Sequence, residues 1–498
     1  MKLSHVIDGI EVVAVSGSLE TEVRGLCIDS RKMTSGDMFV ALRGAGFDGR
    51  DFIRAAIGAG ASAVLLEGAG SVPVHEVPCV MVRDARAALA RISGNFHSNP
   101  SDRMDVLGVT GTNGKTTTAY LIRSILRAAG HSVGMIGTIS YMIGEEATEA
   151  PFTTPEAPEF QGLLKRMLDA GCGYVVSEVS SHALAQMRVD GTRFRVAVFT
   201  NLTPEHLDFH KDMRSYFNAK KRLFTELLEG ASVVNVDDPY GAELSSVLRG
   251  NVLTFGIGTE ADIMAREISN TREGLSFEIV TGDSLTGELV SEAGPLRIET
   301  SLVGMFNVYN ILAAAGACLA LGVEGRHIVA GIKKMEPVEG RFRRVEAGQD
   351  FLCIVDFAHT EDALRRLITT AREFTEGRLI TVFGCGGDRD RSKRPAMGEV
   401  ATGLSDFTVI TSDNPRSEDP MEIIEEIISG VVGDAYEALP DRTEAIKRAV
   451  GMARTGDTVI IAGKGHEAYQ EIKGVRHGFS DVEKAVESIT AIQGGGRA

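Results

Sequence analysis

The stretch Gly108-Val-Thr-Gly-Thr-Asn-Gly-Lys-Thr-Thr-Thr118 decides the fold of this chain. It follows an apolar segment with strand character that contains Val106 and Leu107, and it opens a segment with helical periodicity. Glycines in such a turn let successive backbone N–H groups point at a phosphate, while Lys115 adds a positive charge and Thr116 a hydroxyl for Mg²⁺. The strict P-loop pattern would place its first glycine at residue 109, which is valine, so the loop is a variant. A strand, a glycine-rich turn and a helix in this order predict a nucleotide-binding α/β domain.

Length and composition limit the class of protein. A chain of 498 residues exceeds the size of about 250 to 300 residues that a single core usually reaches, so we expect about three domains. The net charge of −16 argues against binding to nucleic acid or to an anionic membrane. The six cysteines show no zinc-ligand spacing, which indicates buried free thiols in a reducing compartment. The N-terminus lacks the apolar core of a signal peptide, and the run from Ile311 to Val323 is too short for a span of about 20 residues. We expect a soluble cytoplasmic protein, and a monomer.

The order of apolar segments predicts an α/β protein with three domains. Residues 1–98 alternate short apolar runs with helix-like segments, which predicts a small α/β domain that ends before a polar turn. Residues 99–335 contain apolar strands separated by helices, as a parallel sheet requires. Within this part, residues 251–303 become polar and turn-rich, which is typical of an antiparallel flap. Residues 336–498 again alternate strands and helices and form a Rossmann-like third domain.

Polar motifs follow four predicted strands of the third domain. They are Asp356-Phe-Ala-His359, Gly384-Cys-Gly-Gly-Asp-Arg-Asp390, Asp413-Asn-Pro-Arg416 and Gly463-Lys-Gly-His-Glu467. Ligands of open α/β sheets bind beyond the carboxyl ends of the strands. We therefore expect the four motifs to converge on one edge of the sheet and to form a binding site.

Several segments together resemble the ATP-dependent Mur ligases of peptidoglycan synthesis, and the likeness spans nearly the whole chain. They are Thr110-Gly-Thr-Asn-Gly-Lys-Thr116, Glu178-Val-Ser-Ser-His182, Asn201-Leu-Thr-Pro-Glu-His-Leu-Asp208, Tyr216-Phe-Asn-Ala-Lys-Lys-Arg-Leu-Phe224 and Asn307-Val-Tyr-Asn310. Within this family, four segments resemble the branch that adds the third residue of the stem peptide. They are Asp29-Ser-Arg31, Thr153-Thr-Pro155 and the third-domain motifs at 413–416 and 463–467. Two residues depart from the family pattern: Glu361 stands where proline is usual, and Lys211 stands where glycine is common. We expect these differences to affect details of substrate contact and not the reaction.

The resemblance implies an ATP- and Mg²⁺-dependent carbon–nitrogen ligase that forms ADP and phosphate. Its substrates would be UDP-N-acetylmuramoyl-L-alanyl-D-glutamate and meso-diaminopimelate, joined through an acyl phosphate. Several negative oxygens must approach one another in this reaction, so the site needs cations. The implied catalytic residues are Lys115, Glu178, His206 and Lys220. The implied metal ligands form two sites, Thr116 with Glu178 for one Mg²⁺ near the β- and γ-phosphates, and His206 with Lys220 for a second metal. In this family pattern Lys220 carries a carbamate (N6-carboxylysine) formed from CO₂, which requires a neutral amine.

The resemblance also implies three sets of binding residues. ATP would be bound by Gly111, Thr112, Asn113, Gly114, Lys115, Thr116, Thr117, Asn307, Arg341 and Asp356. The uridine-diphosphate muramoyl dipeptide would be bound by Ile28, Ser30, the loop Gly44-Ala-Gly46, Thr153, Thr154, Ser180, Gln186 and Arg188. Diaminopimelate would be bound by Arg389, Asp413, Asn414, Pro415, Arg416, Gly463 and Glu467. Arg416 presents a planar fork that suits the extra carboxylate of diaminopimelate and repels the ammonium of lysine.

Three alternatives remain open at this stage. A lysine-adding relative would share nearly every motif. A folylpolyglutamate-type ligase would share the phosphate loop and the acyl phosphate, although the Asp-Asn-Pro-Arg loop and the first domain count against it. A nucleotide-dependent switch without turnover belongs to another class, and the presence of Lys115, Glu178, His206 and Lys220 disfavours it.

Overall fold

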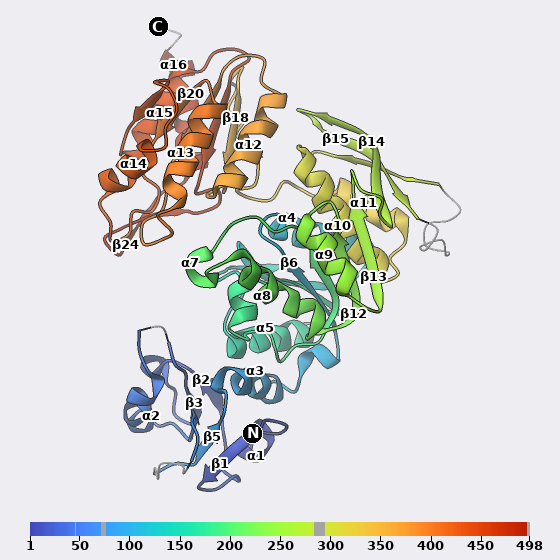
Figure 1. Cartoon of the computed structure of the whole chain (residues 1–498), viewed down its shortest axis with the longest axis vertical. Coiled ribbons are helices and arrows are strands. Elements are labelled where there is room, and N and C mark those ends of the chain that lie inside the picture. The colour runs from blue at the N-terminus through green and yellow to red at the C-terminus, as the bar shows by residue number, and fades with distance from the viewer. Residues whose placement is uncertain (45, 71–75, 283–293, 496–498) are drawn as a thin grey trace.

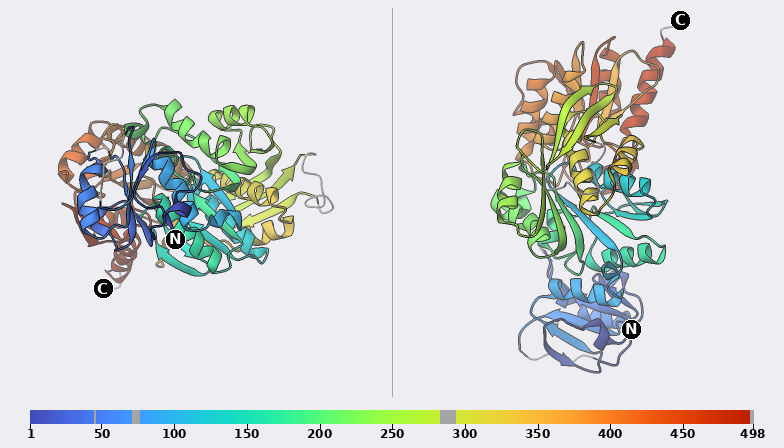
Figure 2. Two further views of the ribbon diagram at one scale, coloured as in Figure 1. Left: turned by 90° about the horizontal axis from the view of Figure 1, so that it is seen from below. Right: turned by 90° about the vertical axis from the view of Figure 1, so that its right-hand side faces the viewer.

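Three α/β domains follow one another along the long axis of the molecule (Figure 1). The structure is a computed structural model and describes residues 1–44, 46–70, 76–282 and 294–495. The blue N-terminal domain and the red C-terminal domain lie at opposite ends, with the middle domain between them, in both side-on views (Figures 1 and 2). The predicted fold class, an α/β chain with three domains, is confirmed.

The N-terminal domain contains a sheet in the order β1-β5-β4-β3-β2. Its strands are β1 (Val12–Ser16), β2 (Gly25–Cys27), β3 (Asp37–Ala41), β4 (Ala63–Glu67) and β5 (Cys79–Val82), and its helices are α1 (Leu3–Val6), α2 (Ile53–Gly58) and α3 (Ala85–Phe96). The pairs from β2 to β5 are parallel, and β1 joins β5 antiparallel. Helix α3 begins after Asp84, whose carboxylate accepts hydrogen bonds from the N–H groups of Arg86 and Ala87.

The middle domain is built on a long sheet in the order β16-β15-β14-β13-β12-β11-β6-β10-β7-β8-β9. Its strands are β6 (Asp105–Thr110), β7 (Val133–Ile136), β8 (Ser140–Ile143), β9 (Glu146–Glu149), β10 (Tyr174–Glu178), β11 (Phe194–Phe199), β12 (Leu228–Asn235), β13 (Asn251–Gly256), β14 (Ile263–Thr271), β15 (Gly274–Thr281) and β16 (Leu296–Thr300). Its helices are α4 (Lys115–Ala128), α5 (Ala157–Asp169), α6 (Ser181–Ala185), α7 (Leu207–His210), α8 (Met213–Thr225), α9 (Pro239–Val247), α10 (Met305–Ala320) and α11 (Gly325–Lys333). The strands from β7 to β13 in this order are parallel.

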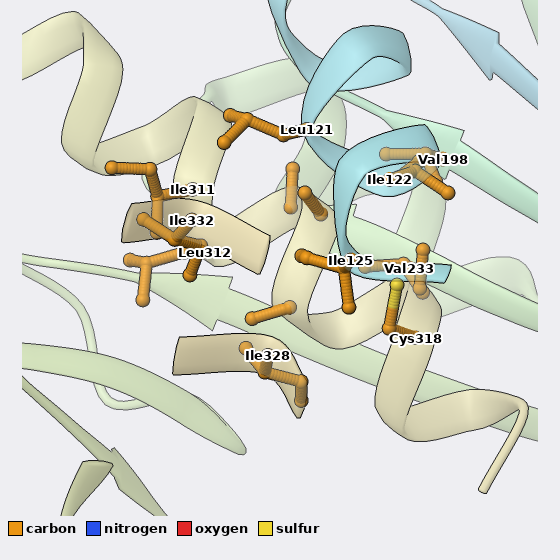
Figure 3. Packing of buried hydrophobic residues seen from close by; sticks show 14 of the residues in the cluster. Leu121, Ile122, Ile125, Val198, Val233, Ile311, Leu312, Cys318, Ile328 and Ile332 are labelled. Atoms are coloured by element: carbon orange, nitrogen blue, oxygen red, sulfur yellow. The ribbon is translucent and has the colours of Figure 1, made fainter. Parts of the chain in front are cut away.

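Alternation along β6 builds the core on both faces of this sheet. Leu107 and Val109 point to the face covered by α4, α10 and α11, whereas Val106 points to the face covered by α5 and α8. Figure 3 shows the first face, where Ile125 of α4 lies among side chains of α10, α11 and the strands, namely Ile311, Leu312, Ile328, Ile332, Val198 and Val233. Each such buried side chain contributes about 1.5–3 kcal/mol. This packing holds the start of α4, and with it the phosphate loop, against the sheet.

Helix α10 contains most of the apolar run from Ile311 to Val323, and it is a core helix. It is buried against β12 and β13. Among the helices in the described ranges, none is both long and apolar enough to cross a membrane.

The predicted antiparallel flap starts later than residue 251. Asn251–Gly256 forms β13, which pairs in parallel with β12, and its Leu253 and Phe255 are buried in the same core as α10. The antiparallel part consists of β14, β15 and β16. Residues 283–293 of the predicted flap lie outside the described residues.

The third domain contains a sheet in the order β17-β18-β22-β19-β20-β21. Its strands are β17 (Arg343–Arg344), β18 (Leu352–Asp356), β19 (Leu379–Phe383), β20 (Phe407–Ile410), β21 (Tyr436–Ala438) and β22 (Thr458–Ala462), followed by the hairpin β23 (Tyr469–Ile472) and β24 (Val475–Gly478). Its helices are α12 (Glu361–Glu373), α13 (Lys393–Leu404), α14 (Pro420–Ile428), α15 (Arg442–Met452) and α16 (Asp481–Gly495). The strands from β18 to β21 in this order are parallel, so their carboxyl ends share one edge. The expected convergence of the four motifs is confirmed.

A buried ion pair stabilises the edge of the sheet at which the parallel strands of the third domain end. Arg442 at the start of α15 and Asp481 at the start of α16 are fully buried and lie 2.7 Å apart. The Arg442 guanidinium also donates to two carbonyl oxygens, that of Ser412, which follows β20, and that of Ala462, which ends β22. One side chain therefore ties two helices to two of the strand ends that carry polar motifs.

Candidate active site

The phosphate loop requires glycine at two positions. Gly111 and Gly114 have φ angles of 147° and 88°, a region that residues with a side chain rarely adopt. A Cβ atom at Gly111 would lie 1.9 Å from the Thr200 hydroxyl oxygen, and one at Gly114 would lie 2.3 Å from Oδ1 of Asn310. Helix α4 begins at the next residue, Lys115, so its free N–H groups face the loop. The sequence prediction of an anion-binding turn agrees with this geometry.

Two lysines meet at this loop. Lys115 Nζ donates to the carbonyl oxygens of Gly111 and Thr112, at 3.0 and 2.8 Å. Lys220 Nζ, whose residue is only 1 % exposed, donates to the same Gly111 carbonyl at 2.8 Å and lies 4.6 Å from the centre of the Tyr216 ring. Burial and the charge of Lys115 lower the pKa of Lys220 well below its ordinary value. A surface position for Lys220, which its basic neighbours in the sequence would suggest, is therefore wrong.

Glu178 ends β10 and is almost fully buried beside the loop. Its carboxylate accepts hydrogen bonds from the Thr116 hydroxyl at 2.9 Å, the Thr138 N–H at 2.8 Å and the Thr138 hydroxyl at 3.0 Å. Carboxylate and hydroxyl oxygens are ligands that suit Mg²⁺. Among the described residues there is no cluster of three or more His, Cys, Asp or Glu side chains spaced to hold a metal. The donor set thus fits a Mg²⁺ ion that takes its remaining ligands from phosphates and water, as Mg²⁺ usually does.

His206 lies at the start of α7, on the side of the site nearest the third domain. Its Nε2 is 3.7 Å from Oε1 of Glu205, and the same oxygen is 3.6 Å from Nε2 of His359 in the third domain. Partial burial, together with the charges of Lys115 and Lys220, lowers the pKa of His206 to about 4, so the imidazole is neutral at neutral pH and can act as a ligand. His210 is buried and its Nε2 lies 2.9 Å from the Ser181 hydroxyl oxygen, within hydrogen-bond distance.

A cavity of about 400 Å³ lies between the middle and third domains, directly beside the loop. Of the predicted nucleotide-binding residues it is lined by Asn113, Gly114, Thr116, Thr117, Asn307, Arg341 and Asp356. The other three, Gly111, Thr112 and Lys115, form the loop beneath it. Both domains thus contribute to one nucleotide-sized space.

Contacts within this cavity position three of the predicted residues. Asn307 donates through Nδ2 to the Val303 carbonyl at 2.8 Å, while its Oδ1 accepts from Asn310 at 3.0 Å. Asp356 accepts from the N–H groups of Phe342 and Ala358, and burial raises its pKa. Arg341 reaches across the domain boundary to the Thr116 hydroxyl at 3.3 Å.

Sequence reasoning missed several residues of this cavity. Tyr309 donates its hydroxyl to Asp237 at 2.8 Å, and both line the space. Asp237 follows β12, so the rule about strand ends could have found it. Asp362, which directly precedes the cavity residue Ala363, accepts from Asn113 at 2.9 Å and from Thr203 at 3.3 Å. No local sequence pattern predicts the contact between Asn113 and Asp362, because the two residues belong to different domains.

The predicted sugar-peptide residues separate into two groups. Thr153, Thr154, Ser180, Gln186 and Arg188 lie together beside Glu178: Thr154 donates to the Glu178 carbonyl at 2.8 Å, and Arg188 donates to the Thr154 carbonyl and to Gln186. Ile28 and Ser30 belong to the N-terminal domain, just after β2. Gly44 is described, whereas Ala45 of the predicted loop lies outside the described residues. Thr138, which bonds to both Thr153 and Glu178, was missed although it follows β7.

The predicted amino-acid residues gather at the strand ends of the third domain. Asn414 donates through Nδ2 to Oε2 of Glu467 at 2.8 Å, and Gly463 leaves no room for a side chain beside Asp413. Arg416 donates to the Gly387 carbonyl at 2.7 Å. Arg389 and Arg416 both lie beside Gly386, because a Cβ atom there would be 2.9 Å from Nη1 of Arg416 and 3.9 Å from Cγ of Arg389. Burial and the neighbouring charge of Arg416 lower the pKa of Arg389. Pro415 lies between Asn414 and Arg416, with its carbonyl against Gly387.

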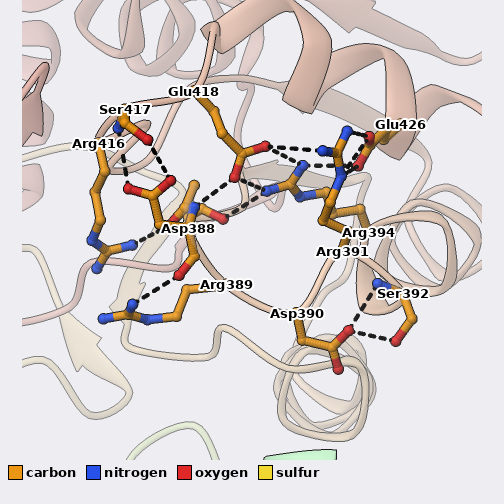
Figure 4. A network of polar contacts seen from close by, with 12 residues as sticks. Asp388, Arg389, Asp390, Arg391, Ser392, Arg394, Arg416, Ser417, Glu418 and Glu426 are labelled. Atoms are coloured by element: carbon orange, nitrogen blue, oxygen red, sulfur yellow. Dashed lines mark hydrogen bonds and ion pairs between the residues drawn. The ribbon is translucent and has the colours of Figure 1, made fainter. Parts of the chain in front are cut away.

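Three cations follow Arg389 in the same basic turn, namely Arg391, Lys393 and Arg394, and their contacts support this loop; Figure 4 shows those of Arg391 and Arg394. Arg394 is fully buried and pairs with Glu418 at 2.9 Å and with Glu426 at 2.8 Å. Arg391 also pairs with Glu426, and Lys393 donates to the His359 carbonyl at 2.8 Å. The turn is therefore a set of ion pairs and hydrogen bonds rather than a solvated run of charge.

A second cavity, of about 1300 Å³, connects the two sides of the site. From the middle domain it is lined by Thr138 and Thr153, and from the third domain by His466, Glu467 and Tyr469. Of the predicted residues, Thr153 of the sugar-peptide set and Glu467 of the amino-acid set line this one interdomain cleft.

Comparison with known proteins agrees with this arrangement. Three family models match: "Mur ligase family, catalytic domain" over residues 22–97, "Mur ligase middle domain" over residues 109–318, and "Mur ligase, glutamate ligase domain" over residues 340–465. The chain is 44 % identical to the UDP-N-acetylmuramoyl-L-alanyl-D-glutamate--2,6-diaminopimelate ligase of Geobacter metallireducens, over 100 % of both chains. It is 42 % identical to the protein of the same name from Clostridioides difficile, over 98 % of this chain and 100 % of that one. A solved structure of a ligase of that name is 32 % identical and superimposes with a TM-score of 0.68 over 99 % of each chain.

Proposed function

This chain belongs to the Mur ligase family, and we propose that it is the ATP-dependent ligase that adds meso-diaminopimelate to UDP-N-acetylmuramoyl-L-alanyl-D-glutamate. The reaction forms ADP and phosphate and supplies a precursor of peptidoglycan. The main support from the structure is the shared interdomain cleft, which has Thr138 and Thr153 beside the phosphate loop on one wall and Glu467 on the other. A reaction that joins a phosphorylated acid to an amine needs such a common space.

The reaction has two steps. A carboxylate oxygen of the D-glutamyl residue attacks the γ-phosphorus of ATP, the bond to the β-phosphate oxygen breaks, and an acyl phosphate and ADP form. The amine of diaminopimelate then attacks the acyl carbon, the amine loses a proton, and phosphate leaves from the tetrahedral intermediate. Lys115, at the start of α4, stabilises the negative charge that gathers on the transferred phosphoryl group.

Mg²⁺ is part of the proposal. Thr116 and Glu178 would hold one ion near the β- and γ-phosphates, and His206 with Lys220 as a carbamate would hold a second. Both ions would neutralise charge on the phosphate oxygens. The support is the oxygen donor set around Glu178, the neutral imidazole of His206 and the burial of Lys220. CO₂ reacts only with the neutral form of an amine, which burial favours.

The remaining predicted roles are part of the same proposal. Asn307, Arg341 and Asp356 bind ATP together with the loop residues 111–117. Ile28, Ser30, Thr153, Thr154, Ser180, Gln186 and Arg188 bind the uridine-diphosphate muramoyl dipeptide. Arg389, Asp413, Asn414, Pro415, Arg416, Gly463 and Glu467 bind diaminopimelate. The two guanidinium groups suit its remote carboxylate, and Glu467 suits its remote amine.

The third domain closes over the nucleotide in this scheme. Contacts that already cross the boundary support it, namely Arg341 with Thr116, Asp362 with Asn113, and His359 with Glu205. Closure excludes water, which would otherwise hydrolyse the acyl phosphate. We place the domain limits at 1–98, 99–335 and 336–498, and we propose a cytoplasmic monomer that binds neither nucleic acid nor membranes.

The decisive assay is phosphate release with ATP and the muramoyl dipeptide, comparing meso-diaminopimelate, lysine and no amino acid. We expect diaminopimelate to exceed both others by about tenfold or more, and Arg416→Ala to abolish that preference. Arg448→Ala, which changes an exposed pair with Glu437, is the matched control. Equal rates with lysine would favour the lysine-adding relative. ATP binding without substrate-dependent release would favour the switch and reject the ligase.

A further inference from the structure

Lys464 is a fully buried lysine to which the proposed function gives no role. Its Nζ lies 3.0 Å from Oδ1 of Asn414, 3.0 Å from Oε2 of Glu467 and 3.9 Å from Oδ1 of Asp413. A buried ammonium is costly unless it is paired and hydrogen-bonded. All three of these partners belong to the proposed site for the incoming amino acid.

The first consequence concerns the orientation of the Asn414 amide. Lys464 Nζ and the Glu471 N–H, which is 2.8 Å away, are both donors, so both must face Oδ1. The amide nitrogen Nδ2 is thereby directed to Glu467. Without the lysine, the Glu471 N–H alone would hold the amide in this orientation.

The second consequence concerns Glu467, whose side chain is 20 % exposed and lines the interdomain cleft. The bonds from Lys464 and from Asn414 both go to Oε2. They fix one oxygen of the carboxylate and leave Oε1 to accept a hydrogen bond from a ligand. An ammonium group is the ligand that suits a carboxylate oxygen of this kind.

The distribution of charge matches a diamino diacid. Asp413, Glu467 and Asp481 carry three negative charges against the two positive charges of Lys464 and Arg442, so this end of the site has a net negative charge. Arg389 and Arg416, which both lie beside Gly386, form the cationic end, with Glu471 3.9 Å from Nε of Arg416. The remote half of diaminopimelate carries both an ammonium and a carboxylate, one for each end.

We propose that Lys464 is a positioning residue for the remote amine of the amino-acid substrate, acting by holding Asn414 and Glu467 so that Oε1 of Glu467 receives that amine. The proposal rests on the proposed function. Removing Lys464 also removes a like charge from the neighbourhood of the substrate ammonium, which by itself would strengthen binding. The loss of placement outweighs this gain, because the Glu467 side chain can turn toward solvent once its counter-ion Lys464 is gone.

The test compares two amino acids in two proteins. 2-Aminopimelate has the reactive amine and the remote carboxylate of diaminopimelate but lacks the remote amine. For the wild type we expect kcat/KM with diaminopimelate to exceed that with 2-aminopimelate on the order of 100-fold. For Lys464→Met, which keeps the length of the side chain, we expect the ratio to fall below about tenfold, mainly through the KM for diaminopimelate. Lys447→Met on the exposed side of α15 should keep the wild-type ratio.

A structural defect would lower both rates equally and leave the ratio unchanged, which would overturn the proposal. A tighter KM for diaminopimelate in Lys464→Met would overturn it as well. If this variant does not fold, as thermal unfolding would show, Lys464→Gln carries the same test, because it keeps a hydrogen-bond donor in the buried space and removes the charge that holds Glu467. The selective loss of the diaminopimelate preference is again the expected result, and an equal loss for both substrates is again the opposite one.

The partial reaction separates this proposal from the proposed function. Exchange of label between ADP and ATP that depends on the muramoyl dipeptide reports acyl phosphate formation without any amino acid. Lys464→Met should keep this exchange within about twofold of the wild type. Absence of exchange in the wild type would reject the proposed ligase. Normal exchange with an unchanged substrate ratio would reject only the role of Lys464.

Discussion

Lys115 and Lys220 donate hydrogen bonds to the same acceptor, the carbonyl oxygen of Gly111, at 3.0 and 2.8 Å. Two ammonium groups held this close repel each other, and Lys220 is the more deeply buried of the two. The shift of its pKa to well below the ordinary value follows from that burial and that repulsion. A neutral amine beside a phosphate loop is the form that CO₂ can modify.

Lys220→Ala should lower kcat by about 100-fold or more, because it removes the group that we propose as a carbamate ligand. Added formate or acetate should restore part of the activity by supplying a carboxylate. Lys220→Arg, which keeps a positive charge but cannot form the carbamate, should stay inactive. Lys221→Ala on the same helix is the control and should keep activity within about twofold. Full phosphate release by Lys220→Ala would contradict the assignment.

Glu178→Gln should lower kcat on the order of 100-fold and raise the Mg²⁺ concentration needed for half-maximal phosphate release. The amide can keep the contacts with Thr116 and Thr138, so the fold is retained and the lost negative charge is what the assay measures. Glu399→Gln on the exposed side of α13 serves as the matched control. An unchanged Mg²⁺ dependence would show that Glu178 is not a ligand.

Asp481→Asn should destabilise the third domain by about 3–5 kcal/mol, because it leaves the buried guanidinium of Arg442 without its counter-charge. Urea unfolding followed by circular dichroism measures this, since the chain has no tryptophan for fluorescence. Glu437→Gln breaks an exposed pair with Arg448 and should cost about 1 kcal/mol or less. Equal effects of the two substitutions would mean that burial does not decide the strength of the pair.

Stability should fall in acid through Glu418. Its hydrogen bonds from Arg394 lower its pKa to about 2. Because the pKa of Glu418 is lower in the folded state than in the unfolded chain, its ionised carboxylate stabilises the fold at pH values above about 4.5. This stabilisation is lost as the pH falls toward 2. Because solvent screens part of the interaction, we expect Glu418→Gln to cost on the order of 1 kcal/mol at neutral pH. The difference in Tm from the wild type should shrink steadily from about pH 5 to about pH 2, and a constant difference would contradict this.

Local patterns were sufficient for much of the site. Gly111, Gly114 and Lys115 could be placed because a strand, a turn and a helix impose backbone angles that few sequences satisfy. The motifs after β18, β19, β20 and β22 could be grouped because parallel strands end at one edge. The predicted start of the antiparallel flap at residue 251 was wrong. The alternation of polar and apolar residues in β13 does not show whether its neighbouring strand is parallel or antiparallel.

Contacts between distant segments could not be predicted in this way. Three contacts join segments that are far apart in the sequence, and no local motif predicts them. They are Thr138 with Glu178, Asp362 with Asn113, and Glu205 with His359. The burial of Lys220 and Lys464 belongs to the same class, because both look like surface lysines in the sequence. Such contacts depend on how helices and domains pack, which short-range periodicity does not encode.

The sequence by itself determined the order of strands and helices, the phosphate-binding turn and the residue types at the strand ends, because backbone geometry and hydrophobic periodicity act over a few residues. Only the tertiary structure decided which of those residues share a cleft, which lysines are buried and which oxygen of Glu467 is left for a ligand. The physical reason is that hydrogen-bond partners and burial depend on distances in space between segments that are far apart in the chain.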